Sequence, residues 1–128
     1  MYINIDTKQI LNINNESDLQ KSVVKYLRKA DLLFIVNQGE FLDTIHKRVE
    51  ATKLGYTKGS VDLMILTPCG GYSGLAFEFK SPTGFGNIMK EQRGFMEILE
   101  HECNYLCVFS NDYAEIIEII IKYVNDLL

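Results

Sequence analysis

The spacing of apolar and polar residues predicts alternating helices and strands along the chain. Apolar residues recur every three or four positions in the helical segments, and short apolar runs bounded by glycine or polar residues mark the strands. In order, the predicted elements are a strand or arm in the first dozen residues, a helix from Glu16 capped by Asn15 or Ser17, a buried strand within 31–39, an ambiguous polar stretch over 40–56 that can be helical, strands over 61–67 and 74–80, a helix over 87–102, a strand over 105–110 and a helix over 112–128. This order predicts an α/β fold with a mixed β-sheet flanked by helices.

The two central strands predict a hairpin around the turn at 68–71, where two glycines follow a proline and a cysteine. If the turn is centred on the two glycines, the paired positions sum to about 141 and Asp62 lies opposite Phe79. A register shifted by one residue would place Asp62 opposite Glu78 or Lys80. In each case the Asp62 carboxylate lies beside the end of the second strand.

Glu78 and Lys80 stand at the end of an otherwise apolar strand. Side chains alternate along a strand, so these two charges point to one face and Phe79 points to the other. A structural ion pair is one explanation for them. The carboxylate of Asp62 offers a second, because two neighbouring carboxylates repel each other unless a cation or a shared proton lies between them. Two oxygen donors with an open face suit Mg²⁺ or Mn²⁺, which keep several water ligands.

Further polar residues fall on the apolar faces of predicted helices. Glu16 and Gln20 are four residues apart on the edge of the inward-facing side of the first helix, and Gln92 lies on the apolar face of the helix over 87–102. An acid in a first helical turn can simply interact with the helix dipole, which is the simpler explanation for Glu16. Buried polar groups need partners, so Glu16 or Gln20, together with Gln92, are candidates for ligands or supports of the same site.

Composition narrows the class of protein. The 128 residues are 47% hydrophobic and 23% charged, which predicts one globular domain over 1–128. The chain does not start with the basic and apolar run of a secretory signal, and the apolar segment 116–124 is too short for a membrane span. We therefore expect an intracellular protein, in the cytoplasm or in the nucleus of a eukaryotic host, that is neither secreted nor bound to membranes. Three cysteines and two histidines do not form a closely spaced zinc-ligand set, and buried free thiols are the expectation.

Charge is distributed unevenly along the chain. The net charge is −4, which does not by itself indicate a nucleic-acid-binding protein. The segment 46–58 nevertheless carries Lys47, Arg48, Lys53 and Lys58 against a single acid, whereas the segment 112–128 is acidic. A solvated charged face is the simpler interpretation of the basic segment taken alone, and phosphate binding is the functional one.

Together these positions resemble a known nuclease pattern. The matching residues are, in order, Glu16 with Gln20, then Lys58-Gly59-Ser60-Val61-Asp62-Leu63, then Glu78-Phe79-Lys80, and finally Gln92. In type and order they resemble the VRR-NUC family of the PD-(D/E)XK nuclease superfamily, over residues 16–124. The order of four motifs is more specific than an isolated Asp…Glu-x-Lys match. The family usually has proline before its aspartate; Val61 stands there in this chain and suits a strand.

The resemblance implies a restriction-endonuclease-like core and a role for each matching residue. Asp62, Glu78 and the main-chain carbonyl of Phe79 correspond to metal ligands, and Glu16 corresponds to a further ligand from the first helix. Lys80 corresponds to the lysine that positions or polarises the attacking water. The other corresponding residues are Gln92 as a support of the site, Gln20 as an alternative to Glu16, Gly59 in the segment before the aspartate, and Lys47, Arg48, Lys53 and Lys58 as DNA contacts.

The resemblance therefore implies a DNA endonuclease that depends on Mg²⁺ or Mn²⁺ and acts on branched or duplex DNA. Short stand-alone members of the family resemble Holliday-junction resolvases of viruses and mobile elements, which act in recombination and repair; a four-way junction is thus the preferred substrate and a homodimer the expected form. Five isoleucines within 116–121 surround most of the last helix, which favours a dimer, although burial within one copy also explains them. Two alternatives are an inactive nuclease scaffold that binds nucleic acid or protein, and a structural α/β domain whose acids form surface pairs.

Overall fold

The computed structural model describes residues 13–37, 42–80 and 90–128. Its four strands form one sheet in the order β1-β2-β3-β4, in which only the pair β3–β4 is parallel. The elements are α2 (Glu16–Lys29), β1 (Phe34–Val36), α3 (Ile45–Lys53), β2 (Leu63–Ile65), β3 (Gly74–Phe79), α4 (Lys90–His101), β4 (Tyr105–Ser110) and α5 (Tyr113–Val124). The predicted α/β fold with a mixed sheet is confirmed. The strand or arm expected in the first dozen residues lies outside the described residues, as does the expected start, at 87–89, of the helix over 87–102.

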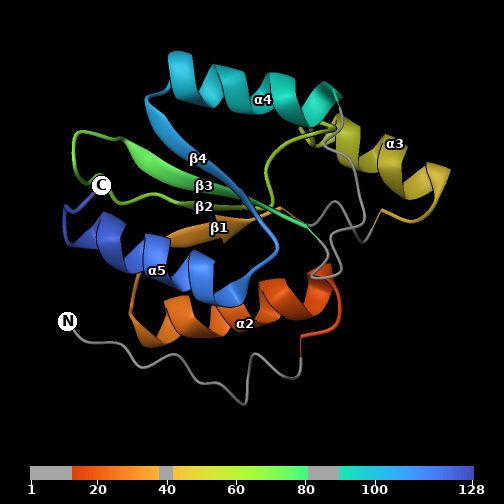
Figure 1. Cartoon of the computed structure of the whole chain (residues 1–128). Helices are drawn as coiled ribbons and strands as arrows, with labels where there is room; N and C mark the ends of the chain where they lie inside the picture. The colour runs from red at the N-terminus through yellow and green to blue at the C-terminus, as the bar shows by residue number, and fades with distance from the viewer. Residues whose placement is uncertain (1–12, 38–41, 81–89) are drawn as a thin grey trace.

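Helices cover both faces of the sheet (Figure 1). Helices α2 and α5 pack together on one face, α4 lies over the other, and α3 lies at the end of the molecule near the start of α4. Because both faces of β3 are covered, all six of its residues are buried. Leu75, Phe77 and Phe79 join the core formed with α2 and α5, whereas Ala76 joins a smaller core with Met96 of α4. A charged residue on this strand is therefore held inside the protein.

Helix α2 begins where the sequence places a capping residue. The side chain of Asn15 accepts a hydrogen bond of 2.8 Å from the amide of Asp18, which satisfies one of the free amides of the first turn. Leu19, Val23 and Leu27 are fully buried in the core, as their spacing predicts. The first residue of α2 is thereby placed at one end of the sheet.

The turn of the β2–β3 hairpin is centred as predicted. Cys69 and Tyr72 exchange hydrogen bonds of 3.1 and 2.9 Å across Gly70 and Gly71. These glycines have φ angles of +60° and +84°, the left-handed conformation that a two-residue hairpin turn requires.

The register of the strands differs by one residue from the value that the turn predicts. Leu63 pairs with Phe77 and Ile65 with Leu75, so the paired positions sum to 140. Three residues, 66–68, separate β2 from the turn, against two, 73–74, between Tyr72 and Leu75 on the other side, so the first strand contains one extra residue. Such a bulge shifts every later pair by one position. The expectation that Asp62 lies opposite Phe79 is corrected, and the alternative register is the one the protein adopts.

Strand β1 is less buried than its composition predicts. Phe34 packs against the main core, but Ile35 is 52% exposed and Leu33 before the strand is also exposed. The expectation of a buried strand is wrong here, because β1 lies at the edge of the sheet and pairs only with β2 among the described strands.

The isoleucines of α5 pack into the core of their own chain. Ile116, Ile117 and Ile120 are fully buried, and Ile119 and Ile121 pack against the same core. Burial in the chain's own core thus explains them, and α5 gives no separate support for a dimer. None of the helices in the described part of the chain is both long and apolar enough to cross a membrane.

Candidate metal and nuclease site

A cavity of about 470 Å³ opens at the end of the sheet where β2 begins and β3 ends. Residues from distant parts of the chain meet here, because the strands, α2, α3 and α4 all have an end near this point (Figure 1). The lining residues are Glu16, Asn37, Leu42, Arg48, Thr52, Tyr56, Lys58, Gly59, Ser60, Asp62, Glu78 and Gln92. Four of the five predicted catalytic residues, Glu16, Asp62, Glu78 and Gln92, are therefore brought together, with the predicted Arg48, Lys58 and Gly59 around them.

Asp62 and Glu78 lie side by side across the hairpin. One further step of the β2–β3 register pairs Asp62 with Glu78. The amide of Asp62 donates to the carbonyl of Phe77 at 3.1 Å, and Oδ2 of Asp62 accepts a hydrogen bond of 2.8 Å from the amide of Phe79. These two contacts fix the aspartate against the end of β3.

Glu78 is a buried acid, with 4% of its surface exposed. The pKa of its carboxyl is raised from 4.5 to about 8, chiefly by burial and then by the charge of the neighbouring Asp62, while Lys80 acts to lower it. Within the described residues, its buried Oε2 atom has no hydrogen-bond partner. A buried oxygen without a donor is costly for folding and points to a ligand that the site can take.

Gln92 connects the other oxygen of Glu78 to Lys80. Its Nε2 donates to Oε1 of Glu78, and its Oε1 accepts a hydrogen bond of 3.3 Å from Nζ of Lys80. Nζ of Lys80 also lies 5.7 Å from the centre of the Phe109 ring, a cation–π distance. The side-chain amide of Gln92 on α4 thus fixes the carboxyl of Glu78 relative to the ammonium group of Lys80.

Asn37 is a site residue that the sequence did not reveal. It follows β1 and donates from Nδ2 to Oγ of Ser60 at 2.6 Å and to the carbonyl of Ser60 at 3.3 Å. Its main-chain amide donates to the carbonyl of Asp62 at 2.8 Å. These bonds, which we call the Asn37 clamp, hold the segment that carries Asp62. An asparagine after an apolar run has many uses, and only the pairing of β1 with β2 brings this one to the site.

Gly59 allows the same segment to approach α4. Its φ angle is +85°, and a Cβ atom built there would lie 2.6–2.9 Å from atoms of Glu91, including main-chain atoms. Only a residue without a side chain fits such a contact. The predicted supporting role of Gly59 therefore has a steric basis.

The comparison with solved structures concerns the whole fold. No family model matches the chain, and no curated protein matches it. A solved structure described as a "VRR_NUC domain protein" superimposes with a TM-score of 0.70, covering 87% of this chain and 88% of that chain at 21% sequence identity. This chain has the VRR_NUC fold. The resemblance drawn from the order of motifs is thus confirmed at the level of the fold.

Within the VRR_NUC fold, the two candidates on α2 are separated. Glu16 lines the cavity of Asp62 and Glu78, and its charge adds to the rise in the pKa of Glu78. Gln20, one turn later, lines a different cavity along the outer side of α2. Glu16 is therefore the candidate that the structure places beside the carboxylate pair.

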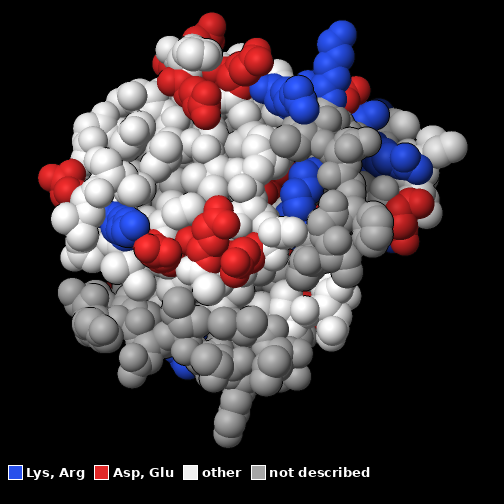
Figure 2. All heavy atoms as spheres, in the orientation of Figure 1, with Lys and Arg blue, Asp and Glu red and all other residues white. Residues whose placement is uncertain are grey.

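The predicted DNA contacts fall into two groups. Arg48 and Lys58 line the site cavity, although Nζ of Lys58 also lies 3.9 Å from Glu91. Lys47 and Lys53 lie on α3 outside the cavity and pair with acids of the same segment, Asp43 and Glu50, at 2.8 and 3.3 Å. Figure 2 shows Lys and Arg side chains where α3 and the start of α4 lie, and acidic side chains over α5.

The donor set fits a hard divalent cation with few protein ligands. Asp62 and Glu78 supply carboxylate oxygens in a cavity with room for water, and one of these oxygens is Oε2 of Glu78, which has no hydrogen-bond partner among the described residues. Glu16 does not complete a closer cluster: in the described part of the chain, no three His, Cys, Asp or Glu side chains are grouped tightly enough to hold a metal ion. Mg²⁺ and Mn²⁺ accept this arrangement because water fills their remaining positions.

Proposed function

We propose that this chain is a VRR-NUC nuclease that hydrolyses DNA phosphodiester bonds with Mg²⁺ or Mn²⁺. The observation that carries the proposal is the pair Asp62 and Glu78, placed side by side in a cavity and linked through Gln92 to Lys80. A structural α/β domain would gain nothing from burying a carboxyl whose pKa is raised to about 8 beside a second acid.

Hydrolysis of a phosphodiester needs an attacking water and relief of negative charge. The water oxygen forms a new bond to phosphorus, one ester P–O bond breaks, and the leaving alcohol takes up a proton. A bound Mg²⁺ or Mn²⁺ would lower the pKa of water and offset charge on the phosphoryl oxygens. Asp62 and Glu78 are the side chains that would hold it, and the resemblance adds the carbonyl of Phe79; Glu16, which lines the same cavity, would orient a water there.

Lys80 acts on the same reaction through its charge. Its ammonium group donates to Gln92, so it is held as a cation with limited freedom. A fixed cation near the scissile phosphate would stabilise the charge that develops on the oxygens and orient the attacking water. Gln92 is a positioning residue in this scheme, because it acts on Glu78 and Lys80.

Substrate binding would rest on cations that line the cavity. Arg48 and Lys58, which line the cavity, would contact phosphates near the cleaved bond, and Lys47 and Lys53 would extend this basic region along α3. Such contacts depend on salt and do not read the base sequence. A branched substrate, in particular a four-way junction cut by a homodimer, is the finer proposal, and it rests on the resemblance to short stand-alone members of the family.

Cleavage of a labelled four-way junction and of its matched linear duplex tests the proposal. Wild type and Asp62→Asn are compared in Mg²⁺, in Mn²⁺ and in EDTA. Asp31→Asn is the matched control, because Asp31 is exposed and follows the opposite end of α2 from Glu16. We expect metal-dependent cuts that Asp62→Asn abolishes and Asp31→Asn retains.

The outcomes separate the coarse proposal from the fine one. Symmetric cuts near the branch point would establish a junction resolvase, and equal cutting of both substrates would keep the nuclease and remove the junction preference. Folded wild type that cuts neither substrate in either metal would overturn the proposal in favour of an inactive nucleic-acid-binding scaffold.

A further inference from the structure

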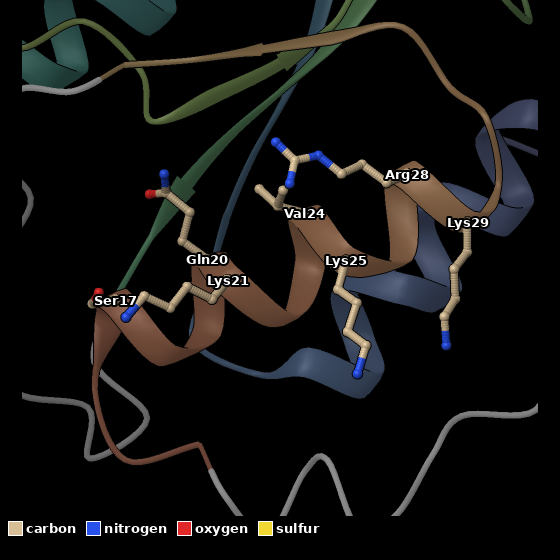
Figure 3. Close-up of a pocket in the computed structure, with 7 residues that line it drawn as sticks. All are labelled: Ser17, Gln20, Lys21, Val24, Lys25, Arg28 and Lys29. Carbon is tan, nitrogen blue, oxygen red and sulfur yellow. The ribbon is translucent and has the colours of Figure 1, made fainter.

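The outer surface of α2 carries four exposed cations around a cavity of about 520 Å³ (Figure 3). Within 13–37, 42–80 and 90–128, none of the ion pairs involves any of the four. We call this surface the α2 basic face; its residues are Ser17, Gln20, Lys21, Val24, Lys25, Arg28 and Lys29.

Four other surface lysines of this protein are paired locally with acids. Lys47, Lys53, Lys58 and Lys122 each lie within 4.0 Å of a carboxylate oxygen, in three cases on the same helix or just before it. Such pairing is usual for a solvated helix surface. Exposed cations without such a pair also occur at Lys90 and Arg93 on α4. The α2 basic face is distinguished because four of them, without an ion pair among the described residues, gather around one cavity.

The spacing of the cations also indicates that they are not there to stabilise the helix. Lys21, Lys25 and Lys29 follow one another at intervals of four residues, and like charges at this spacing destabilise a helix. The helix dipole favours Arg28 and Lys29 in the last turn, but not Lys21 and Lys25. Figure 3 shows Arg28 extending from one flank and Lys25 and Lys29 from the other, so positive charge borders the cavity on both sides.

The α2 basic face begins one residue away from the candidate nuclease site. Glu16 lines the site cavity, and the next residue, Ser17, lines the cavity of the α2 basic face. From Glu16 to Arg28 the helix advances about 18 Å at 1.5 Å per residue. This length corresponds to about five base pairs of duplex DNA, whose strands carry one phosphate per 3.4 Å of axis. A row of anions that starts at the site would meet the cations in succession.

We infer that the α2 basic face binds the sugar-phosphate backbone of DNA on one side of the cleaved bond. This inference rests on the proposed nuclease function, which it extends from the cavity to a path along α2. The path is separate from the basic segment on α3, a helix that lies apart from α2 (Figure 1). The contacts involve phosphates alone, so they bind without regard to sequence.

The salt dependence of DNA binding tests the inference without cleavage. Binding of a fluorescein-labelled 30-base-pair duplex is measured by anisotropy in EDTA, from 0.05 to 0.3 M salt, for wild type and Lys21→Gln/Lys25→Gln. The slope of log affinity against log salt should fall by about 1.8, at about 0.9 per phosphate contact, and affinity at 0.1 M salt should fall roughly tenfold or more. Lys25→Gln alone is compared with Lys122→Gln, which removes an exposed lysine from α5; the first should lower the slope by about 0.9 and the second should leave it unchanged.

Each outcome bears on the inference separately from the nuclease proposal. An unchanged slope in the double variant, whose fold is checked by circular dichroism, overturns the α2 path and leaves a cleaving wild type as a nuclease. If the double variant has a reduced slope and the wild type never cleaves DNA, the path along α2 is supported and the nuclease function is rejected. A wild type that binds polyglutamate but not the duplex at 0.05 M salt would overturn DNA as the partner and point to an acidic protein.

Discussion

Replacement of Glu78 by Gln should make the protein more stable at alkaline pH in EDTA. The variant keeps the shape of the side chain and its acceptor for Nε2 of Gln92, but it cannot take a negative charge in the buried site. Burial and the nearby Asp62 raise the pKa of the Glu78 carboxyl to about 8 in the folded state, against 4.5 in an unfolded chain. The folded protein therefore holds this proton more tightly than the unfolded chain does.

The sign and size of the effect follow from this difference. Below about pH 4.5 the carboxyl is protonated in both states, so its contribution to stability is fully present. As the pH rises to about 8, the unfolded state loses the proton first, and the free energy of unfolding of wild type falls. The interval from 4.5 to about 8, at about 1.36 kcal/mol per pH unit, corresponds to a loss of about 5 kcal/mol at most. Relaxation of the site would reduce the loss, and we expect a difference of about 2–5 kcal/mol between the two proteins at pH 9.

Urea denaturation at pH 5, 6, 7, 8 and 9, followed by circular dichroism in EDTA, measures the difference. Because both proteins are compared at each pH, the titration of groups that do not interact with Glu78 cancels. Glu97→Gln is the control, since it removes one exposed carboxylate from α4 and should change stability by less than about 0.5 kcal/mol. Parallel pH profiles for wild type and Glu78→Gln would refute the argument that Glu78 is held in a site that disfavours its charge.

Three further predictions concern the metal, the Asn37 clamp and the contact at Gly59. Binding of Mg²⁺ at pH 7 should release close to one proton, because the carboxyl of Glu78 must lose it; calorimetry in buffers of different ionisation enthalpy measures this, and a buffer-independent heat would contradict it. Asn37→Ala should lower the free energy of unfolding by about 1–3 kcal/mol and slow DNA cleavage at saturating substrate, with DNA affinity in EDTA unchanged; an equal loss of affinity would mean that Asn37 acts on DNA rather than on Asp62. Gly59→Ala should destabilise the protein by more than about 2 kcal/mol in urea denaturation, and clearly more than Gly55→Ala, which shares a positive φ but has open space around it; equal losses would leave the contact with α4 without effect.

Much of the fold could be predicted from local pattern. The cap at Asn15, the apolar row of α2, the strand over 105–110 and the two-residue turn of the hairpin are all found where the sequence places them. These features depend on residues close together in the chain, where steric and hydrogen-bonding rules act directly. The exposure of β1 was missed, because the composition of an apolar strand does not say whether it lies at the centre or the edge of a sheet.

The candidate site was predicted in its residues rather than in its geometry. Asp62, Glu78, Lys80 and Gln92 were selected for charges and amides in places where packing alone offers no reason for them. The structure adds how they are joined: one extra residue in the bulge sets Asp62 beside Glu78, and the amide of Gln92 bridges acid and lysine. A bulge is hard to predict from sequence, because it depends on which backbone groups find partners in the neighbouring strands.

The sequence alone thus determined the element order, the inward-facing residues of the helices and the chemical types gathered at the site, since each is encoded by neighbours a few positions apart. Only the tertiary structure decided which of Glu16 and Gln20 meets the carboxylates, that Asn37 holds the Asp62 segment, and that Gly59 must approach Glu91. These contacts join residues from 23 to more than 60 positions apart or depend on how whole helices pack. Their positions follow from the packing of the completed sheet and helices, which no local rule of spacing contains.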